Sequence, residues 1–222
     1  MMRQYNDEFK HKGLRRKLVE QLREKGISDE QVLTAIGNIP RHFFLEAGLD
    51  VYAYEDRAFP IAEGQTISQP YTVAYQTQLL QVKPHDRILE VGTGSAYQAV
   101  ILAEMGADVY SIERQKKLTE INQKFTYLLE FPNLRLFYGD GYDGLPQYAP
   151  FDKIIITAGA PYIPPKLIDQ LKTGGVMVVP VDENQTQRMK RITKAEDGSL
   201  KEESFEEFSF VPMLGFTSER PR

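Results

Sequence analysis

The chain contains no cysteine, few histidines and no long apolar run. The absence of cysteine excludes a disulfide framework, a thiolate-bound metal, an iron–sulfur cluster and a thiol nucleophile. The 3 histidines, at positions 11, 42 and 85, are too scattered to suggest a histidine metal site, so we predict no metal. No apolar run approaches the roughly 20 residues of a membrane helix, and residues 1–16 lack the apolar core of a signal sequence. We therefore expect a cytoplasmic protein without a membrane partner.

Positive charge is not in excess either. The 27 basic residues are outnumbered by 31 acidic ones, which leaves a net charge of -4 at neutral pH. Because binding along a nucleic-acid backbone needs a net-basic face, this balance argues against a nucleic-acid partner. Hydrophobic residues make up 41% and charged residues 26% of the 222 positions, as in an ordinary folded protein. We predict a single domain and a monomer.

Helical periodicity is clear in the first 40 residues. The apolar stripe of the first predicted helix is formed by Leu14, Leu18, Val19 and Leu22. Gly26 ends this helix, and the basic residues 15–17 are expected on its solvated face. Residues 28–31, Ser-Asp-Glu-Gln, match a capping box and predict a second helix, which Pro40 stops. An N-terminal helical segment therefore begins the fold.

Residues 41–69 show no clear periodicity. A loop of this length is uncommon in a compact domain unless it is functional, so we expect a lid over a binding site. Pro70 then begins a predicted helix that continues to Val82, because proline is favourable at the first helical position.

From residue 87 the pattern alternates between strand and helix. Strands are predicted at 87–91, 107–112, 134–138, 151–157 and 175–181, and helices at 97–104, 116–130 and 166–171. This order predicts an α/β fold with a doubly wound, mostly parallel Rossmann-like sheet. The tail, residues 188–194 and 200–211, predicts a C-terminal antiparallel hairpin at the sheet edge. The predicted domain, 1–222, thus contains helices and lid (1–69), a Rossmann-like core (70–181) and the hairpin (182–222).

A glycine-containing loop follows the first strand of the alternating region. At Gly92 and Gly94 the missing side chains let the backbone approach a ligand. Glu113 ends the next strand about 20 residues beyond Gly92, the spacing of an acid that accepts hydrogen bonds from ribose hydroxyls. Asp140, followed by Gly141, ends the third strand and can meet an adenine amino group. The alternatives are a strand-end cap or ion pair for Glu113 and a plain turn for Asp140.

The side chains of this loop distinguish it from a dinucleotide site. Thr93, Ser95 and Gln98 are polar but not cationic, and Tyr97 stands where the dinucleotide pattern has its third glycine. An adenosine ligand that carries an amino acid therefore fits better than a pyrophosphate, with Glu90 near its ammonium group. We predict S-adenosylmethionine as the cofactor, and hence the fold of a class I methyltransferase.

Residues 64–71 form a distinctive segment, Gly-Gln-Thr-Ile-Ser-Gln-Pro-Tyr. Further segments of note are 88–98, Gly139-Asp140-Gly141 with Gly144-Leu145-Pro146, Pro40-Arg41, Ala158-Gly159-Ala160-Pro161, 171–175 and Phe210-Val211-Pro212. Together they resemble the protein-L-isoaspartate O-methyltransferase family over nearly the whole chain. One departure is Ala96, because the family usually has Gly-Ser-Gly-Tyr-Gln in this loop. A methyl group there would be strained if the backbone needs a positive φ.

The resemblance implies methyl transfer from S-adenosylmethionine to the free carboxylate of isoaspartyl residues in damaged proteins and peptides, which begins their repair. It implies that Ser68 is the catalytic serine and that Gly92, Gly94, Glu113 and Asp140 bind the cofactor. A carboxyl group with a pKa of about 3.5–4 is ionised at neutral pH, so this reaction needs no general base. Ser68 is then expected to orient the carboxylate. The backbone around Thr66, Ile67 and Val211 is expected to hold the isoaspartyl main chain.

Other interpretations of these residues stay open. A methyltransferase with a small-molecule or other protein acceptor keeps the cofactor residues but gives residues 66–68 no role. A nucleoside-binding module without turnover does not need a serine hydroxyl near the methyl group. Ser68 by itself is also a good N-cap for the helix that begins at Pro70. Tyr71 and Tyr97 are expected to pack beside the crevice rather than to react.

Overall fold

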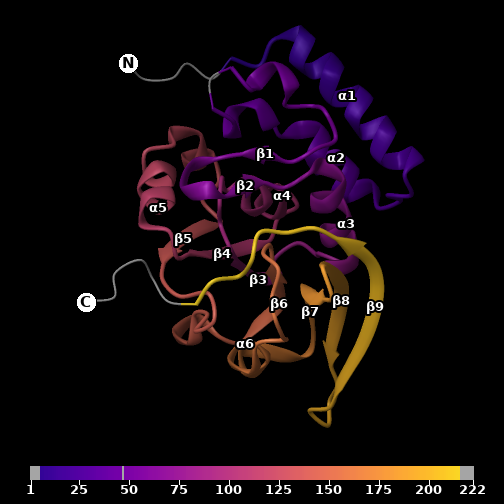
Figure 1. The fold of residues 1–222 in the computed structure, drawn as a ribbon, viewed down its shortest axis with the longest axis vertical. Helices are drawn as coiled ribbons and strands as arrows, with labels where there is room; N and C mark the ends of the chain where they lie inside the picture. Colours follow the sequence, from indigo (N-terminus) through magenta and orange to yellow (C-terminus); the bar gives the residue numbers. More distant parts are fainter. Residues whose placement is uncertain (1–5, 47, 216–222) are drawn as a thin grey trace.

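The structure is a computed structural model that describes residues 6–46 and 48–215. Within these residues a 7-stranded sheet has the order β5-β4-β3-β6-β7-β8-β9 (Figure 1). Strands β5 to β7 pair in parallel, whereas β7, β8 and β9 pair antiparallel. The strands are β3 Arg87–Val91, β4 Asp108–Glu113, β5 Leu134–Tyr138, β6 Phe151–Ile156, β7 Leu171–Glu183, β8 Thr186–Lys194 and β9 Leu200–Phe208. The predicted doubly wound sheet and C-terminal hairpin are confirmed.

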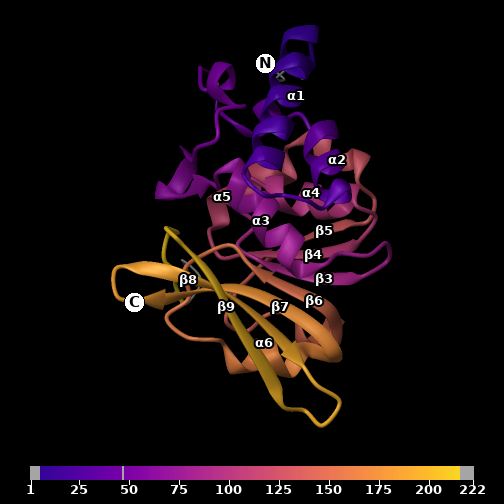
Figure 2. The same ribbon diagram turned by 90° about the vertical axis from the view of Figure 1, so that its right-hand side faces the viewer.

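Helices cover both faces of the parallel part of the sheet (Figure 2). Helices α1 to α5 lie on one side and α6 on the other. Their bounds are α1 Phe9–Glu24, α2 Glu30–Asn38, α3 Pro70–Leu80, α4 Tyr97–Glu104, α5 Lys116–Gln123 and α6 Pro165–Gln170. In β3, Ile88 belongs to the core on the side of α4 and Leu89 to the core on the side of α6. Because both faces are buried, such a strand reads as an apolar run.

The second N-terminal helix begins one residue later than a capping box at Ser28 implies. Asp29 is the N-cap, and its carboxylate accepts hydrogen bonds from the backbone N–H groups of Gln31 at 2.9 Å and Val32 at 3.3 Å. The carboxylate satisfies two of the N–H groups that a helix start leaves without partners, and its charge suits the positive end of the helix dipole.

A buried polar cluster attaches α1 to the segment after α2. Arg15, expected on a solvated face, is 6% exposed because its guanidinium pairs with both oxygens of Asp7, at 2.9 and 3.0 Å. The rings of His11 and His42 stack with centroids 3.9 Å apart, and His42 Nδ1 lies 2.7 Å from the Tyr54 hydroxyl. The view that the histidines are too scattered was therefore wrong for these two, whose ligand atoms lie within 4.8 Å of one another and of Asp7. Arg15 already neutralises the Asp7 carboxylate, so we interpret this buried polar cluster as a structural contact between α1 and the segment after α2.

Residues 41–69 are not a structureless loop. They contain the 3-10 helices η1 Arg41–Phe44, η2 Asp50–Tyr52 and η3 Ala62–Gly64 and the short strands β1 Phe59–Pro60 and β2 Thr66–Ile67. Phe59 pairs with Ile67 across this hairpin, and both side chains are buried. Each element is too short to show a period in the sequence. The hairpin brings residues 66–68 directly to the start of α3.

Two predicted helices have different ends. The helix expected over 116–130 is α5 followed by the 3-10 helix η4, Thr126–Glu130. Helix α3 ends at Leu80 rather than Val82, because Gln81 adopts the left-handed conformation. None of the helices in the described part of the chain is long and apolar enough to cross a membrane.

Candidate active site

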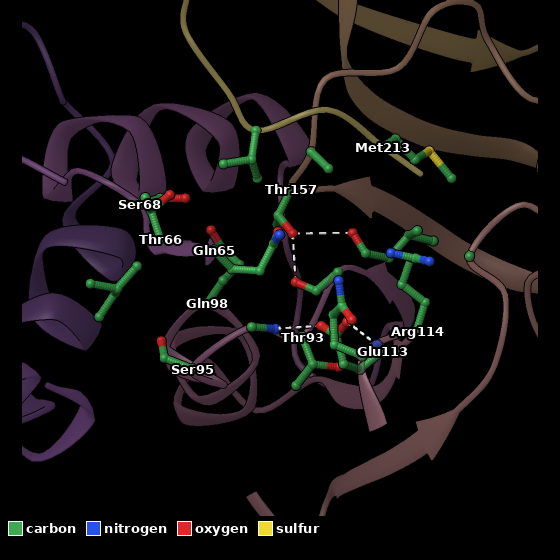
Figure 3. Close-up of a pocket in the computed structure, with 18 of the residues that line it drawn as sticks. Gln65, Thr66, Ser68, Thr93, Ser95, Gln98, Glu113, Arg114, Thr157 and Met213 are labelled. Carbon is green, nitrogen blue, oxygen red and sulfur yellow. Dashed lines mark hydrogen bonds between the residues drawn. The ribbon is translucent and has the colours of Figure 1, made fainter. Parts of the chain in front are cut away.

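A pocket opens beyond the carboxyl ends of β3, β4 and β6, the edge at which open α/β sheets bind ligands (Figure 3). Its lining residues fall in three stretches of the chain, 65–73, 91–158 and 211–214. The predicted site residues in this lining are Thr66, Ile67, Ser68, Gly92, Thr93, Gly94, Ser95, Gln98, Glu113, Gly141 and Val211. One crevice therefore brings together most of the residues that the sequence analysis selected.

The glycine loop leaves its backbone open toward this pocket. Gly92 has a φ of +101°, and a Cβ atom there would lie 2.7 Å from Thr157 Oγ1. Thr157 uses this hydroxyl to donate a hydrogen bond to the Gly92 carbonyl at 2.6 Å (Figure 3). Gly94 also has a positive φ, +53°. A side chain at position 92 would displace Thr157 and strain the backbone, so glycine is required there.

Ala96 occupies a position that favours glycine. It precedes α4 with a φ of 67° and a ψ of 10°, in the left-handed region, and its side chain is fully buried. The condition under which the sequence analysis expected strain at this residue is therefore met.

Glu113 lies at the end of β4 with its carboxylate at the pocket. Its Oε2 accepts a hydrogen bond from the Gly94 N–H at 2.9 Å, and its Oε1 accepts one from the Gln115 N–H at 2.7 Å (Figure 3). The strand-end cap considered for this residue therefore exists, but each carboxylate oxygen has capacity for a further hydrogen bond. Glu113 is thus held in place and can still accept from a ligand.

Two predicted cofactor residues, Glu90 and Asp140, do not line the pocket. Glu90 is fully buried and accepts a hydrogen bond from Ser111, whose hydroxyl also lies 2.5 Å from that of Thr93. Burial raises the pKa of Glu90 to about 8, and its Oε1 has no partner within the described residues. Asp140 Oδ1 accepts from the Tyr142 N–H at 2.9 Å, which is the turn geometry considered for it.

Ser68 is not the N-cap of α3. That position belongs to Gln69, which makes no side-chain cap hydrogen bond. The N–H of Tyr71 instead donates to Asp56 Oδ1 at 2.8 Å, so Asp56 caps the helix from a distant part of the chain. The capping interpretation of Ser68 was therefore wrong, and its side chain lies in the lining of the pocket (Figure 3).

Arg41 lies directly behind Ser68, and the sequence analysis assigned it no role. It is fully buried, donates from Nη2 to the Ser68 carbonyl at 2.8 Å and stacks over the Tyr97 ring at 4.8 Å. Burial lowers the pKa of Arg41 to about 10, so it stays charged at neutral pH. Its Nε and Nη1 have no partner within the described residues. In the sequence, Arg41 stands out only as part of the Pro40-Arg41 pair that contributes to the family resemblance. That pair does not indicate a contact with Ser68.

A parallel sheet with a glycine loop after one strand and an acid at the end of the next defines the class of Rossmann-like, class I methyltransferases. Comparison with known proteins identifies the particular member of this class. A model of Protein-L-isoaspartate(D-aspartate) O-methyltransferase (PCMT) matches residues 13–218, and the chain belongs to this family.

Relatives resemble the chain over nearly its whole length. The protein-L-isoaspartate O-methyltransferases of Cytophaga hutchinsonii and Christiangramia forsetii are 51% and 50% identical, over 94% of this chain and 94% and 97% of theirs. A solved protein-L-isoaspartate O-methyltransferase aligns with a TM-score of 0.82 and 30% identity over 90% of this chain and 66% of its own. A Plasmodium falciparum structure assigned to the same family, in complex with S-adenosyl-L-homocysteine, aligns with a TM-score of 0.79 and 27% identity. The alignment covers 92% of this chain and 98% of that one.

The chain is therefore an S-adenosylmethionine-dependent methyltransferase that acts on the isoaspartyl carboxylate of damaged proteins. The fold class, family, activity and cofactor predicted from the sequence are confirmed. A small-molecule acceptor and a binding module without turnover are not supported by these relatives.

Proposed function

We propose that the crevice holds the cofactor on the side of the glycine loop and the isoaspartyl carboxylate on the side of Ser68. Figure 3 places Ser68 and Thr66 on one side of the pocket and Glu113 on the other. The observation that carries the proposal is that Ser68 lines this pocket and has no capping role in α3. Its hydroxyl is therefore available to a ligand.

The chain's own residues fit the cofactor. Glu113 would accept hydrogen bonds from the ribose hydroxyls, and the backbone of Gly92 and Gly94, which both line the pocket, would lie against the amino-acid end. Glu90 lies beneath this loop, and within the described residues one oxygen of its buried carboxyl has no partner. We assign Glu90 an indirect role: it accepts a hydrogen bond from Ser111, whose hydroxyl lies 2.5 Å from that of Thr93 in the loop, and so it supports the loop from beneath. Thr93, Ser95, Gln98 and Gly141 also line the pocket, and Asp140 acts through the turn it holds.

When bound, the cofactor supplies a methyl group on a sulfonium. The acceptor carboxylate is already ionised at neutral pH, so the residues only have to orient it and exclude water. Ser68 would donate a hydrogen bond to one carboxylate oxygen and so orient the acceptor toward the methyl group that the cofactor would supply. Thr66, Ile67 and Val211, which also line the crevice, hold the isoaspartyl main chain beside it.

The test uses cofactor with a labelled methyl group and two peptides that differ only in isoaspartate or aspartate. We expect base-labile label in the isoaspartyl peptide alone. Ser68→Ala removes a hydrogen bond to a charged group, worth about 1.5–3 kcal/mol, so its kcat/KM should fall by about 10- to 100-fold with cofactor binding unchanged.

Ser199→Ala is the matched control, because Ser199 lies in the exposed turn of the hairpin and its hydroxyl donates to Asp197 Oδ1 within that turn, at 2.6 Å. It should retain full turnover. Full turnover in Ser68→Ala as well would remove Ser68 from the acceptor site. Label in the aspartyl peptide would contradict the assigned acceptor.

We further propose that the chain acts as a single domain with the parts 1–69, 70–181 and 182–222. The three-part lining of the crevice supports this proposal. Residues 1–5 and 216–222 of this division lie outside the described residues. That the enzyme is monomeric and cytoplasmic stays a prediction. That it binds no nucleic acid is a prediction too, and the net charge of -4 supports it.

A further inference from the structure

A second groove continues from the crevice. It runs between the start of α3 and the end of β9, and it shares Thr66, Ser68, Thr157 and Val211 with the crevice. Its other lining residues are Ala58, Gln69, Tyr71, Thr72, Thr186, Glu206, Glu207, Phe208, Ser209 and Phe210. Because Ser68 belongs to both, a polypeptide whose isoaspartyl carboxylate reaches Ser68 has this groove beside its flanking residues.

The charged side chains in the lining of this groove are all acidic. They are Glu206 and Glu207, and among the described residues no lysine, arginine or histidine lines it. Glu207 is ion-paired, because its carboxylate binds Arg188, which also binds Glu183, and it accepts from Thr186 Oγ1 at 3.2 Å. Glu206 is exposed and has no ion pair within the described residues. Glu206 is therefore the carboxylate of the groove whose charge is left to a ligand.

The position of this charge is set by Tyr71. The Tyr71 hydroxyl donates to Glu206 Oε2 at 3.2 Å, which joins the start of α3 to the end of β9. Burial, together with the nearby Glu206 carboxylate, raises the pKa of Tyr71 to about 12, so the phenol stays protonated and remains a donor at neutral pH. Lys25 Nζ lies 5.6 Å from the centroid of this ring, but Lys25 is paired with Asp56.

Aromatic rings lie next to the carboxylate. Tyr71 and Phe208 stack with centroids 6.3 Å apart, and Phe208 and Phe210 lie 6.3 Å apart further along the groove. A surface with an apolar, aromatic wall and one carboxylate suits a side chain with an apolar stem and a cationic end. Lysine and arginine have this chemistry, whereas an acidic side chain would be repelled.

We propose that this groove binds the residues that flank the isoaspartyl group of the substrate. In this proposal Glu206 selects substrates that have a lysine or arginine within three residues of the isoaspartyl residue. The inference rests on the proposed placement of the isoaspartyl group at Ser68. It makes Glu206 a specificity-determining residue for the acceptor.

The experiment compares isoaspartyl peptides that carry lysine, glutamine or glutamate at each of the flanking positions in turn. With the wild-type enzyme we expect kcat/KM at one or more positions to favour lysine over glutamate by roughly 5-fold, and added salt to reduce this ratio. Glu206→Gln keeps the shape and the hydrogen bond of Tyr71, and it should bring the ratio close to one.

Glu196→Gln is the matched control. It removes the same charge from the same hairpin, but Glu196 lies in the turn between β8 and β9 and is not one of the residues that line the groove. This variant should keep the wild-type lysine-to-glutamate ratio.

The failure of this inference can be distinguished from failure of the proposed function. If the glutamine peptide is not methylated at all, the placement of the acceptor is wrong. If it is methylated but all flanking series are flat, or if the lysine preference survives in Glu206→Gln, the role of Glu206 is overturned. An equal loss of the ratio in Glu196→Gln would mean that overall charge decides it, which also overturns that role.

Discussion

Ala96 shows how one residue can depart from the local preference of the backbone. A left-handed conformation costs an L-residue about 1–2 kcal/mol, and Ala96 adopts it at the point where the cofactor loop becomes α4. The backbone is held there on both sides, because the Ala96 N–H donates to Thr93 at 2.7 Å and its carbonyl accepts from Val100 at 3.0 Å. The loop therefore stores a small strain beside the cofactor.

Replacing this residue with glycine should relieve the strain. Ala96→Gly is expected to increase the free energy of unfolding by up to about 1 kcal/mol, since glycine adopts positive φ freely. Urea denaturation measures the difference. Ala99→Gly is the control, because Ala99 is equally buried but helical, and it should be destabilised by about 1 kcal/mol or more. A loss of stability in Ala96→Gly similar to that in Ala99→Gly would contradict the assignment of strain.

At the scale of elements, the agreement between the predicted and the observed helices and strands depends on the length of each element and on whether local contacts stabilise it. The bounds expected for β3, α4 and β5 match the structure, because a strand or helix of five or more residues carries its own pattern. The elements within 41–69 were missed because each has two to four residues. Their stability comes from distant partners, such as Phe59 with Ile67 and Arg41 with the Ser68 carbonyl.

The buried polar cluster between α1 and the segment after α2 makes the free energy of unfolding depend on pH. Burial lowers the pKa of His42 below the ordinary value of 6.5, so the unfolded chain binds a proton more readily than the folded one. The free energy of unfolding should therefore be highest above pH 6.5 and should fall as the pH decreases, with a slope of at most about 1.4 kcal/mol per pH unit from this group. Asp7, whose pKa is lowered despite its burial because Arg15 binds it, adds a further loss below about pH 4.

Urea denaturation between about pH 5 and 8 tests this dependence. His42→Gln should remove most of the slope between about pH 5 and 6.5. His85→Asn is the control, since His85 is exposed and has a φ of 68°, which asparagine tolerates. The same slope in wild type and His42→Gln would show that another group titrates.

At the scale of the whole molecule, the crevice joins three distant parts of the chain. Its lining combines residues before and within α3, residues at or after the ends of β3, β4, β5 and β6, and residues after β9 (Figure 3). A ligand in this crevice therefore contacts all three and stabilises the complete fold rather than one element. Binding to the folded state alone stabilises it by about 2.7 kcal/mol when the ligand is present at 100 times its Kd.

S-adenosyl-L-homocysteine is the probe for this coupling, and thermal unfolding is the measurement. We expect it to raise the Tm of the wild-type protein and to do so much less for Glu113→Gln, which loses the charged acceptor at the pocket. Glu120→Gln, an exposed change on the neighbouring helix α5, should respond like wild type. An equal rise in Tm for Glu113→Gln would exclude Glu113 from the cofactor site.

The sequence alone determined the alternating core, the glycine loop and the acid at its expected distance, because these follow from periodicity and short spacings. It also determined the family through the segment at 64–71. Only the tertiary structure decided that Asp56 caps α3, that Arg41 supports Ser68 and that Glu90 is withdrawn beneath the loop. The contacts of Asp56 and Arg41 join residues that are distant in the chain, and the position of Glu90 depends on which face of the strand its side chain takes. Packing of the complete molecule sets the contacts and the face.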